Sequence, residues 1–223
     1  MKQLFLLSSA TLIGFSIANA QVSTPPPAAV MKTRIIKTDF FAPLTGNVTF
    51  GYEQWLADNF AGQIDIGIIG VGADLWNVNA SGVFFRLSPK LYFNPDWMVD
   101  GMYRTNPMQG FFVKGDIVYS HFDFDDNLYN IFSGSSSTVR VTDNTFAVMI
   151  SLGIQKILAN RVSIDLYAGG GYGYSDAAPH FPAGFIPNPD DQYGRVGKFS
   201  HIQFPNEFPL ALEMGMNIGL LLR

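Results

Sequence analysis

One short segment, HFDFDDN, carries the kind of oxygen ligands that a calcium loop uses. Asp123, Asp125 and Asn127 have the one-three-five spacing of such a loop. The pattern then breaks, because Leu128 stands where the turn glycine belongs and Gly134 where the bidentate glutamate belongs. We therefore expect a solvated loop tip, with no metal and no cofactor. Weak binding of divalent cations that also bridge lipopolysaccharide is the remaining hypothesis.

The histidines raise the question of nucleophilic catalysis, which needs a serine beside a histidine and an acidic group to orient it. Ser120, His121 and Asp123 are close in the sequence, but neighbouring residues of a strand point to opposite faces. Ser120 and His121 are therefore not expected to pair. His180 and His201 show no metal-site spacing, and we expect three loop histidines. No catalytic residue is predicted.

The stretch VSIDLYAGGGYGYS has three consecutive glycines, which raises the question of a phosphate-binding loop. With Gly169 and Gly171 as its first two glycines, a dinucleotide fingerprint would require a third at position 174, where the chain has Tyr174. The alternative is a strand whose second face has little room, since glycine weakens a strand unless something approaches it closely. The sequence favours this second interpretation.

In the segments that position these residues, apolar and polar side chains alternate with a period of two. Ile64, Ile66 and Ile68, for example, alternate with a glutamine, an aspartate and a glycine, as in a strand with one apolar face. No sustained helical periodicity appears after Thr33. We place strands near 33–43, 47–57, 60–72, 82–93, 110–124, 144–157, 161–175 and 208–223. They predict an all-β protein, an eight-stranded antiparallel up-and-down transmembrane β-barrel with a filled polar interior.

The connections between these strands divide into short and long ones. If both chain ends are periplasmic, the long connections fall on the outside and the tight turns on the inside, as in outer-membrane barrels. The expected outer connections are 44–46, 73–81, 125–143 and 176–207, and the expected inner ones are 58–59 and 158–160. The segment 94–109 is long for an inner turn, so it either caps the lumen or marks a strand count that is wrong by one hairpin.

The polar face of the strands holds charges of both signs together with many glycines. The lumen of an eight-stranded barrel is only just wide enough for side chains to fill it, which explains the glycines. Buried charges must pair, so we expect an ion-pair network centred on Arg86, Lys90, Lys114, Glu53 and Asp65. An ion path is the alternative. The predicted lumen residues are Lys37, Asp39, Glu53, Asp65, Arg86, Lys90, Lys114, Asp116, Asp165 and Glu213.

The beginning of the chain predicts export. Residues 1–20 have a positive start, an apolar stretch and an A-x-A-like ending, which indicates a signal peptide. Residues 21–32 form a proline-rich linker, and residues 33–223 form the barrel domain. Charged residues make up only 14% of the chain, against about a quarter in an average soluble domain. The chain has no cysteine and a formal charge of -4, which excludes disulfides and gives no basic surface for nucleic acid.

A long aromatic segment, 180–204, forms the largest predicted outer loop. Loops of this length are usually functional or disordered. Exposed aromatic and aliphatic side chains would suit adhesion or ligand capture, although a loop that only shields the barrel is equally compatible with the composition. The possible surface-recognition residues are Phe181, Phe185, Ile186 and Tyr193.

Several stretches together resemble a known family. They are KTDFFAPLTGNVTFGYEQWL, SPKLYFNPDW, GFFVKGDIVYSHFDF and the alternating last strand. The chain resembles the small outer-membrane β-barrels of the OmpA and porin-like superfamily, and within it uncharacterised barrel families of Gram-negative bacteria. The resemblance implies a location in the cell outer membrane, with lipid, lipopolysaccharide and the barrel assembly machinery as partners.

The resulting expectation is a monomeric outer-membrane barrel with a structural or surface-recognition role and no enzyme activity. Two alternatives remain. One is a lipid A-modifying barrel enzyme that uses His121. The other is a secreted soluble β-barrel with an apolar ligand inside, in which the two faces of the wall would be inverted.

Overall fold

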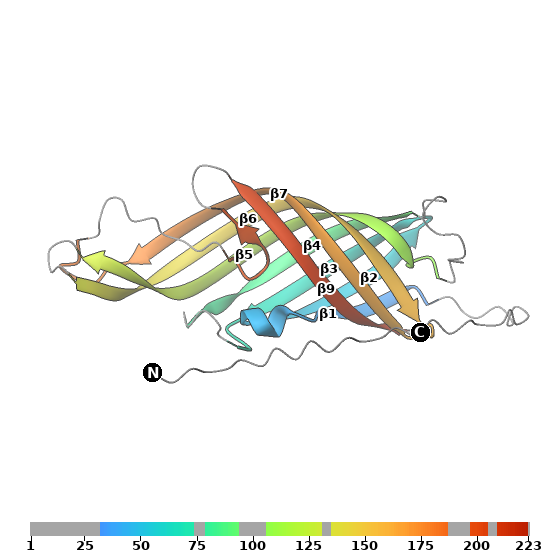
Figure 1. The fold of residues 1–223 in the computed structure, drawn as a ribbon, viewed down its shortest axis with the longest axis horizontal. Coiled ribbons are helices and arrows are strands. Elements are labelled where there is room, and N and C mark those ends of the chain that lie inside the picture. Colours follow the sequence, from blue (N-terminus) through green and yellow to red (C-terminus); the bar gives the residue numbers. More distant parts are fainter. Residues whose placement is uncertain are drawn as a thin grey trace, which may run out of the picture. The chain divides into compact units, whose positions relative to one another are not determined.

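A computed structural model of the chain describes residues 32–73, 79–93, 106–130, 135–186, 197–204 and 209–222. The predicted signal peptide and nearly all of the proline-rich linker lie outside the described residues. None of the described helices is both long and apolar enough to cross a membrane. The elements are β1 (Arg34–Asp39), η1 (Ala42–Thr45), β2 (Asn47–Ala57), β3 (Phe60–Ile69), β4 (Ser81–Phe93), β5 (Gly110–Asn130), β6 (Ser135–Leu158), β7 (Val162–His180), β8 (Ile202–Gln203) and β9 (Leu210–Leu222) (Figure 1).

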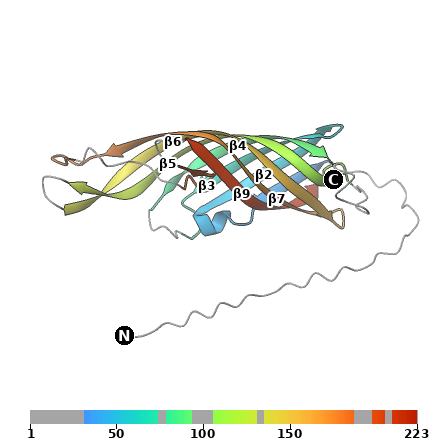
Figure 2. The same ribbon diagram turned by 45° about the horizontal axis from the view of Figure 1, so that its top comes forward.

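The strands close into an antiparallel barrel of eight strands. Each strand from β1 to β6 pairs with the next, and β7 pairs with β9. β1 also pairs with β9, from Arg34 opposite Leu222 to Asp39 opposite Asn217, and this pairing closes the sheet. The short β8 adds two residues to the edge of β9. The predicted all-β barrel and its strand number are confirmed, and Figures 1 and 2 show the strands wrapping around one tube.

The two ends of the barrel differ as the sequence predicts. One end has the tight turns 58–59 and 159–160, where Asp58, Ala159 and Asn160 have φ of 40°, 49° and 51°. We call it the tight-turn end. The opposite end has η1 and the longer connections, and β5, β6 and β7 project beyond the other strands there (Figure 1). We call it the long-loop end.

The predicted loop at 125–143 is wrong, because most of it is a hairpin. β5 and β6 stay paired to Asn130 opposite Ser135, and β7 follows β6 as far as His180 opposite Arg140. The period of two continues through this polar stretch, since Phe124, Val139 and Val141 are buried on one face.

The first strand ends earlier than predicted, at Asp39 instead of residue 43. The Asp39 carboxylate accepts hydrogen bonds from the backbone N–H groups of Phe41 and Ala42, at 2.8 and 3.2 Å. These bonds turn the chain out of the strand and into η1. Gly46, with φ of 81°, ends η1 in the left-handed conformation that glycine tolerates.

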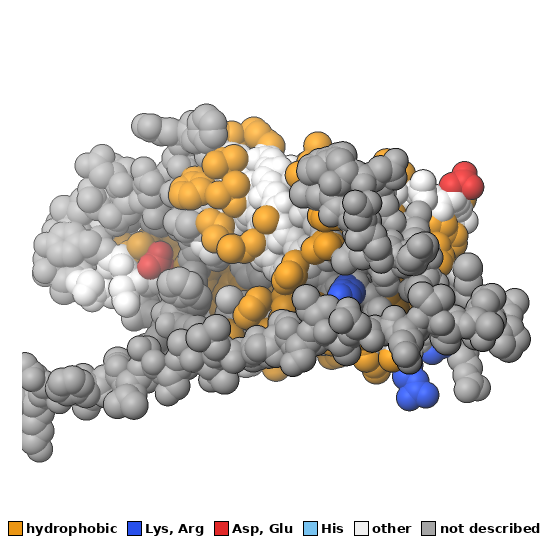
Figure 3. All heavy atoms as spheres, turned by 45° about the vertical axis from the view of Figure 1, so that its right-hand side comes forward, with side chains coloured by type: hydrophobic (Ala, Val, Ile, Leu, Met, Phe, Trp, Pro, Cys, Tyr) orange, Lys and Arg blue, Asp and Glu red, His pale blue; other side chains and the backbone are white. Residues whose placement is uncertain are grey.

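The wall has an apolar outer face and a polar inner face. Outward side chains such as Ile150, Leu152 and Leu220 are 66%, 63% and 62% exposed. Figure 3 shows hydrophobic side chains over the described outer wall on the side it presents. Inward positions leave no room: a Cβ on Gly67 would lie 2.0 Å from the ring of Phe84. Close approach inside the barrel therefore explains the glycines, as the sequence suggests.

Candidate functional site: the charged lumen and its open side

Four charged side chains form a compact group near the tight-turn end, which we call the tight-turn cluster. Lys37 of β1 and Lys90 of β4 each contact Glu53 of β2 and Asp165 of β7. The Lys37 Nζ lies 2.8 Å from Asp165 Oδ2, and the Lys90 Nζ lies 3.1 Å from both carboxylates. All four side chains are no more than 1% exposed. Two cations and two anions therefore neutralise one another where water is excluded.

Neutral groups complete the tight-turn cluster. Lys37 Nζ donates to Gln155 Oε1 at 2.7 Å, and the hydroxyl of Tyr92 donates to Glu53. The Lys90 ammonium lies 4.6 Å from the centroid of the Phe112 ring. These additional interactions stabilise the buried ion pairs, because the free energy needed to remove the charges from water exceeds the free energy gained from a single contact.

A second group, the middle cluster, lies further along the lumen. Lys114 Nζ contacts Asp116 at 2.9 Å and Glu213 at 3.1 Å, and Arg86 lies 3.6 Å from Glu213. Arg86 also donates to the hydroxyl of Tyr167 at 3.2 Å. This cluster contains two cations and two anions, as the tight-turn cluster does.

The predicted lumen residues are all buried except Asp39, which is half-buried at the end of β1. Eight of these ten residues form two clusters instead of the single network that the sequence predicts. Asp65 joins neither cluster by an ion pair among the described residues. It accepts two hydrogen bonds from Gln63 Nε2 instead, at 2.8 and 2.9 Å.

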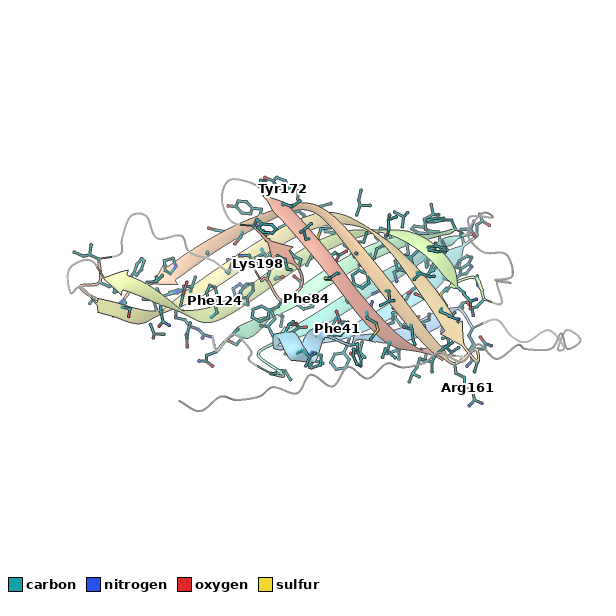
Figure 4. All side chains as sticks on the ribbon, viewed as in Figure 1. Phe41, Phe84, Phe124, Arg161, Tyr172 and Lys198 are labelled. Carbon is teal, nitrogen blue, oxygen red and sulfur yellow. The ribbon has the colours of Figure 1, made fainter. Side chains whose placement is uncertain are left out.

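A segment that we assigned to an outer loop folds into the lumen at the long-loop end. We call residues 197–203 the inward segment. Lys198 Nζ lies 2.6 Å from Asp143 of β6, and Arg86 donates to the backbone carbonyl of Ser200 at 2.6 Å. The ring of Phe199 packs edge-on against Phe122 at 5.2 Å. Figure 4 shows Lys198 within the tube of strands, together with Phe84 and Phe124.

The inward segment includes a buried histidine, which corrects the expectation of an ordinary loop residue. His201 Nδ1 lies 2.9 Å from Ser200 Oγ, and its Nε2 lies 3.3 Å from Gln203 Oε1. Burial lowers the pKa of His201 to about 4, and the positive charges of Arg86 and Lys198 add to this effect. The imidazole is therefore neutral near pH 7, and its second nitrogen faces an amide where a catalytic triad has a carboxylate.

The other candidate chemistry is not assembled. Ser120 points into the barrel, where its hydroxyl lies 3.1 Å from that of Ser200, while His121 is exposed on the opposite face. The predicted separation of this serine and histidine is confirmed. His180 is exposed at the end of β7.

The calcium hypothesis gains no geometric support. Asp123, Asp125 and Asn127 lie on β5, not on a loop tip. Asp125 is bound to Arg140 at 2.9 Å and to Asn79 at 3.1 Å. Within the described ranges, no group of three or more histidine, aspartate or glutamate residues is placed to hold a metal ion.

Two predicted loop features are only partly within the described residues. Phe181 and Phe185 stack at 5.1 Å with an interplanar angle of 8°, and Ile186 is 49% exposed, while Tyr193 lies outside the described residues. In the segment 94–109, the described end includes Met108, which is fully buried in the same cluster as Tyr92 and Phe112. The rest of that segment lies outside the described residues.

The side of the barrel between β1 and β9 is open near the middle cluster. A hollow of ≈1160 Å³ reaches from the outer surface to the lumen at this place. Its polar lining includes Asp39, Arg86 and Glu213, and its apolar lining includes Phe41 and Met214. The sequence signals that predict strands and an ion-rich interior gave no indication of this opening.

Comparisons with known proteins found no matching protein-family model, no matching curated protein and no matching solved structure. Function must therefore be inferred from the faces, the charges and the openings of the barrel itself.

Proposed function

We propose that the chain is an outer-membrane β-barrel with a structural or surface-recognition role and no catalytic function. The observation that carries this proposal is the sorting of side chains across one wall. Aliphatic and aromatic residues such as Ile150, Leu152 and Tyr172 are exposed outside, and ion pairs such as Lys37–Asp165 are buried inside. In water this arrangement is unfavourable, whereas in a bilayer the outer face contacts hydrocarbon and the closed sheet satisfies the backbone.

The filled lumen supports a structural role over conduction. The two charged clusters and the inward segment occupy the interior at successive levels, and Lys37, Glu53 and Asp165 are essentially inaccessible to solvent. An eight-stranded barrel is just wide enough to be filled in this way. We therefore expect no ion conductance from the barrel.

The projecting β5–β6 hairpin supports a recognition role at the cell surface. It extends beyond the barrel wall at the long-loop end, paired as far as Asn130 and Ser135 (Figure 1). Together with the stacked Phe181 and Phe185, the hairpin would present a partly aromatic surface to the outside of the cell. Lipid, lipopolysaccharide and the barrel assembly machinery are the proposed partners of the barrel, which we propose to be a monomer.

The two alternatives fit the observed geometry less well. A soluble barrel with an apolar ligand inside needs an apolar lumen, but the lumen holds both charged clusters. A lipid A-modifying enzyme based on His121 needs a partner nucleophile, but Ser120 lies on the opposite face and His121 contacts Asn144 at 2.7 Å.

Membrane fractionation followed by gel electrophoresis tests the proposal. We expect the protein in the outer-membrane fraction, with a band that changes mobility only after heating, because a closed barrel stays folded in detergent. Recovery of the folded protein from the soluble fraction without detergent would refute the membrane assignment. A tag inserted after Asn188 should be labelled on intact cells, and absence of label would refute the proposed orientation.

A further inference from the structure

The barrel wall has a notch between its first and last strands. β1 ends at Asp39, and the backbone N–H of Phe40 makes one further bond, to Met216 O at 2.8 Å. Further along this edge, β8 pairs only with Ala211 and Leu212 of β9. Among the described residues, neither β1 nor β8 pairs with the stretch 213–215. We call this gap the side notch.

The outer rim of the side notch is apolar. Phe41 on the η1 side is 47% exposed, and Ile202 and Met214 on the opposite side are 43% and 76% exposed. The hollow also continues along the outer wall over Leu166 and Ala168 of β7. Figure 4 shows Phe41 at η1, outside the tube of strands. An apolar chain could therefore lie against the wall and enter the notch without leaving an apolar environment.

The floor of the side notch is polar. Arg86 and Glu213, each 6% exposed, both line the hollow. Arg86 NH2 lies 3.6 Å from Glu213 Oε2, which is beyond hydrogen-bond distance. The floor therefore holds a hydrogen-bond donor and an acceptor that are not bonded to each other.

The charges around the floor restrict what that partner can be. Arg86 is positive, while Asp39 and Glu213 are negative. A carboxylate head would meet Asp39 and Glu213, and an ammonium head would meet Arg86, so either charge is repelled by part of the site. A hydroxyl can accept a bond from Arg86 and donate one to Glu213, and it carries no charge.

We propose that the side notch binds a single-chain lipid with an uncharged, hydroxyl-bearing head, of the monoacylglycerol class. The head occupies the floor beside Arg86 and Glu213, and the chain passes between Phe41 and Met214 to the outer wall. The hollow of ≈1160 Å³ is slightly above the range of roughly 300–1,000 Å³ typical of small-molecule sites. This inference rests on the proposed function only for the origin of the lipid, which would be the membrane around the barrel. Binding itself can be measured on purified protein.

The experiment is native mass spectrometry of the detergent-purified full chain with 1-monooleoylglycerol, oleic acid and oleylamine, which share a C18 chain. We expect one saturable equivalent of monooleoylglycerol and clearly weaker binding of the two charged lipids. Arg86→Lys keeps the positive charge but removes the guanidinium donors, and should weaken binding about tenfold, the effect of losing one good hydrogen bond. Met214→Ser should also weaken binding, because it removes the apolar rim.

The matched control is Ile117→Ser, which makes the same kind of change at an outward-facing residue of β5 that does not line the hollow. It should leave binding unchanged. The proposal is overturned if monooleoylglycerol does not saturate, if the three lipids bind equally, or if Ile117→Ser and Met214→Ser weaken binding to the same extent. A protein that is soluble without detergent yet still binds monooleoylglycerol at the notch would contradict the proposed function and leave this inference standing.

Discussion

The two ends of the lumen accommodate buried charges in different ways. At the tight-turn end, Lys37 and Lys90 each contact two carboxylates, and the wall around them is closed. Arg86 of the middle cluster lies instead beside the side notch and lines its hollow. Both clusters contain unpaired polar atoms, Asp165 Oδ1 in the first and Arg86 Nε in the second, so the opening in the wall is what separates them. Charges in a closed wall stabilise one rigid arrangement, whereas polar groups beside an opening leave room for a ligand or for motion. We therefore infer a structural role for the tight-turn end and expect recognition, if the barrel binds a ligand, at the side notch.

The largest effect should come from breaking the tight-turn cluster. Asp165→Asn leaves Lys37 and Lys90 with one carboxylate, Glu53, between them. Removing one partner of a buried pair costs about 3–5 kcal/mol. The measurement is the urea midpoint of the folded band in lipid vesicles, converted to a free energy of unfolding. A loss below about 1 kcal/mol, the level of an exposed pair, would show that the cluster is not rigidly buried.

Acid should loosen the long-loop end. The pKa of His201 is lowered to about 4 while the inward segment is docked, and returns to about 6.5 when the segment is released. Docking is therefore unaffected above pH 6.5, weakens as the pH falls from 6.5 towards 4, and levels off below that. The loss reaches about 3 kcal/mol at most.

Hydrogen exchange of the Phe199 and Ser200 amides measures this release. Their protection should fall in acid, after correction for the intrinsic pH dependence of exchange. The charged groups Arg86, Lys198 and Asp143 act on His201, so the acid response is compared with that of His201→Gln. This variant retains polar contacts but cannot titrate. Equal acid responses in the two proteins would rule out His201 as the cause.

Filling the crowded interior should have a smaller effect. A Cβ at Gly67 would lie 2.0 Å from the Phe84 ring, whereas a Cβ at Gly197 has no neighbour within 4 Å. Gly67→Ala should cost about 1–3 kcal/mol through overpacking. Gly197→Ala is the control and should change the free energy of unfolding by less than about 0.5 kcal/mol. Comparable unfolding midpoints for the two variants would contradict the tight packing of the lumen.

The smallest effect is expected on the projecting hairpin. Asp125 pairs with Arg140 at 2.9 Å, and both side chains are about one-third exposed. Asp125→Asn should cost about 0.2–1 kcal/mol, and the cost should shrink further in high salt. Urea unfolding at low and high ionic strength checks this. A cost as large as that of Asp165→Asn would remove the contrast between exposed and buried pairs.

The strand pattern could be predicted because it is local. The alternation of Ile64, Ile66 and Ile68 gives the correct outward face of β3, and the boundaries of β2 match the prediction. The hairpin beyond residue 124 was missed because Asp125 and Asp126 have loop-like composition. Their strand pairing comes from the partner strand, which local sequence does not reveal.

The candidate site depends on contacts between distant residues. Alternation identified the inward-facing charges, but could not show that they divide into two clusters on different levels. The inward segment is held by two contacts, Lys198 to Asp143 and Ser200 to Arg86. The residues of these pairs lie 55 and 114 positions apart in the chain. The side notch arises where β1 ends before its neighbour, and that depends on the Asp39 turn and on the register with β9.

The central claim is that the apolar outer face of the wall contacts hydrocarbon. The chain has no cysteine, so single cysteines can be introduced and labelled to test this directly. Spin labels are placed one at a time at Ile150→Cys, Leu152→Cys and Ser151→Cys in protein reconstituted into bilayers. The account predicts that labels at 150 and 152 collide with oxygen and not with a water-soluble nickel complex, while the label at 151 is shielded from both. Strong collisions of the labels at 150 and 152 with the nickel complex would contradict it.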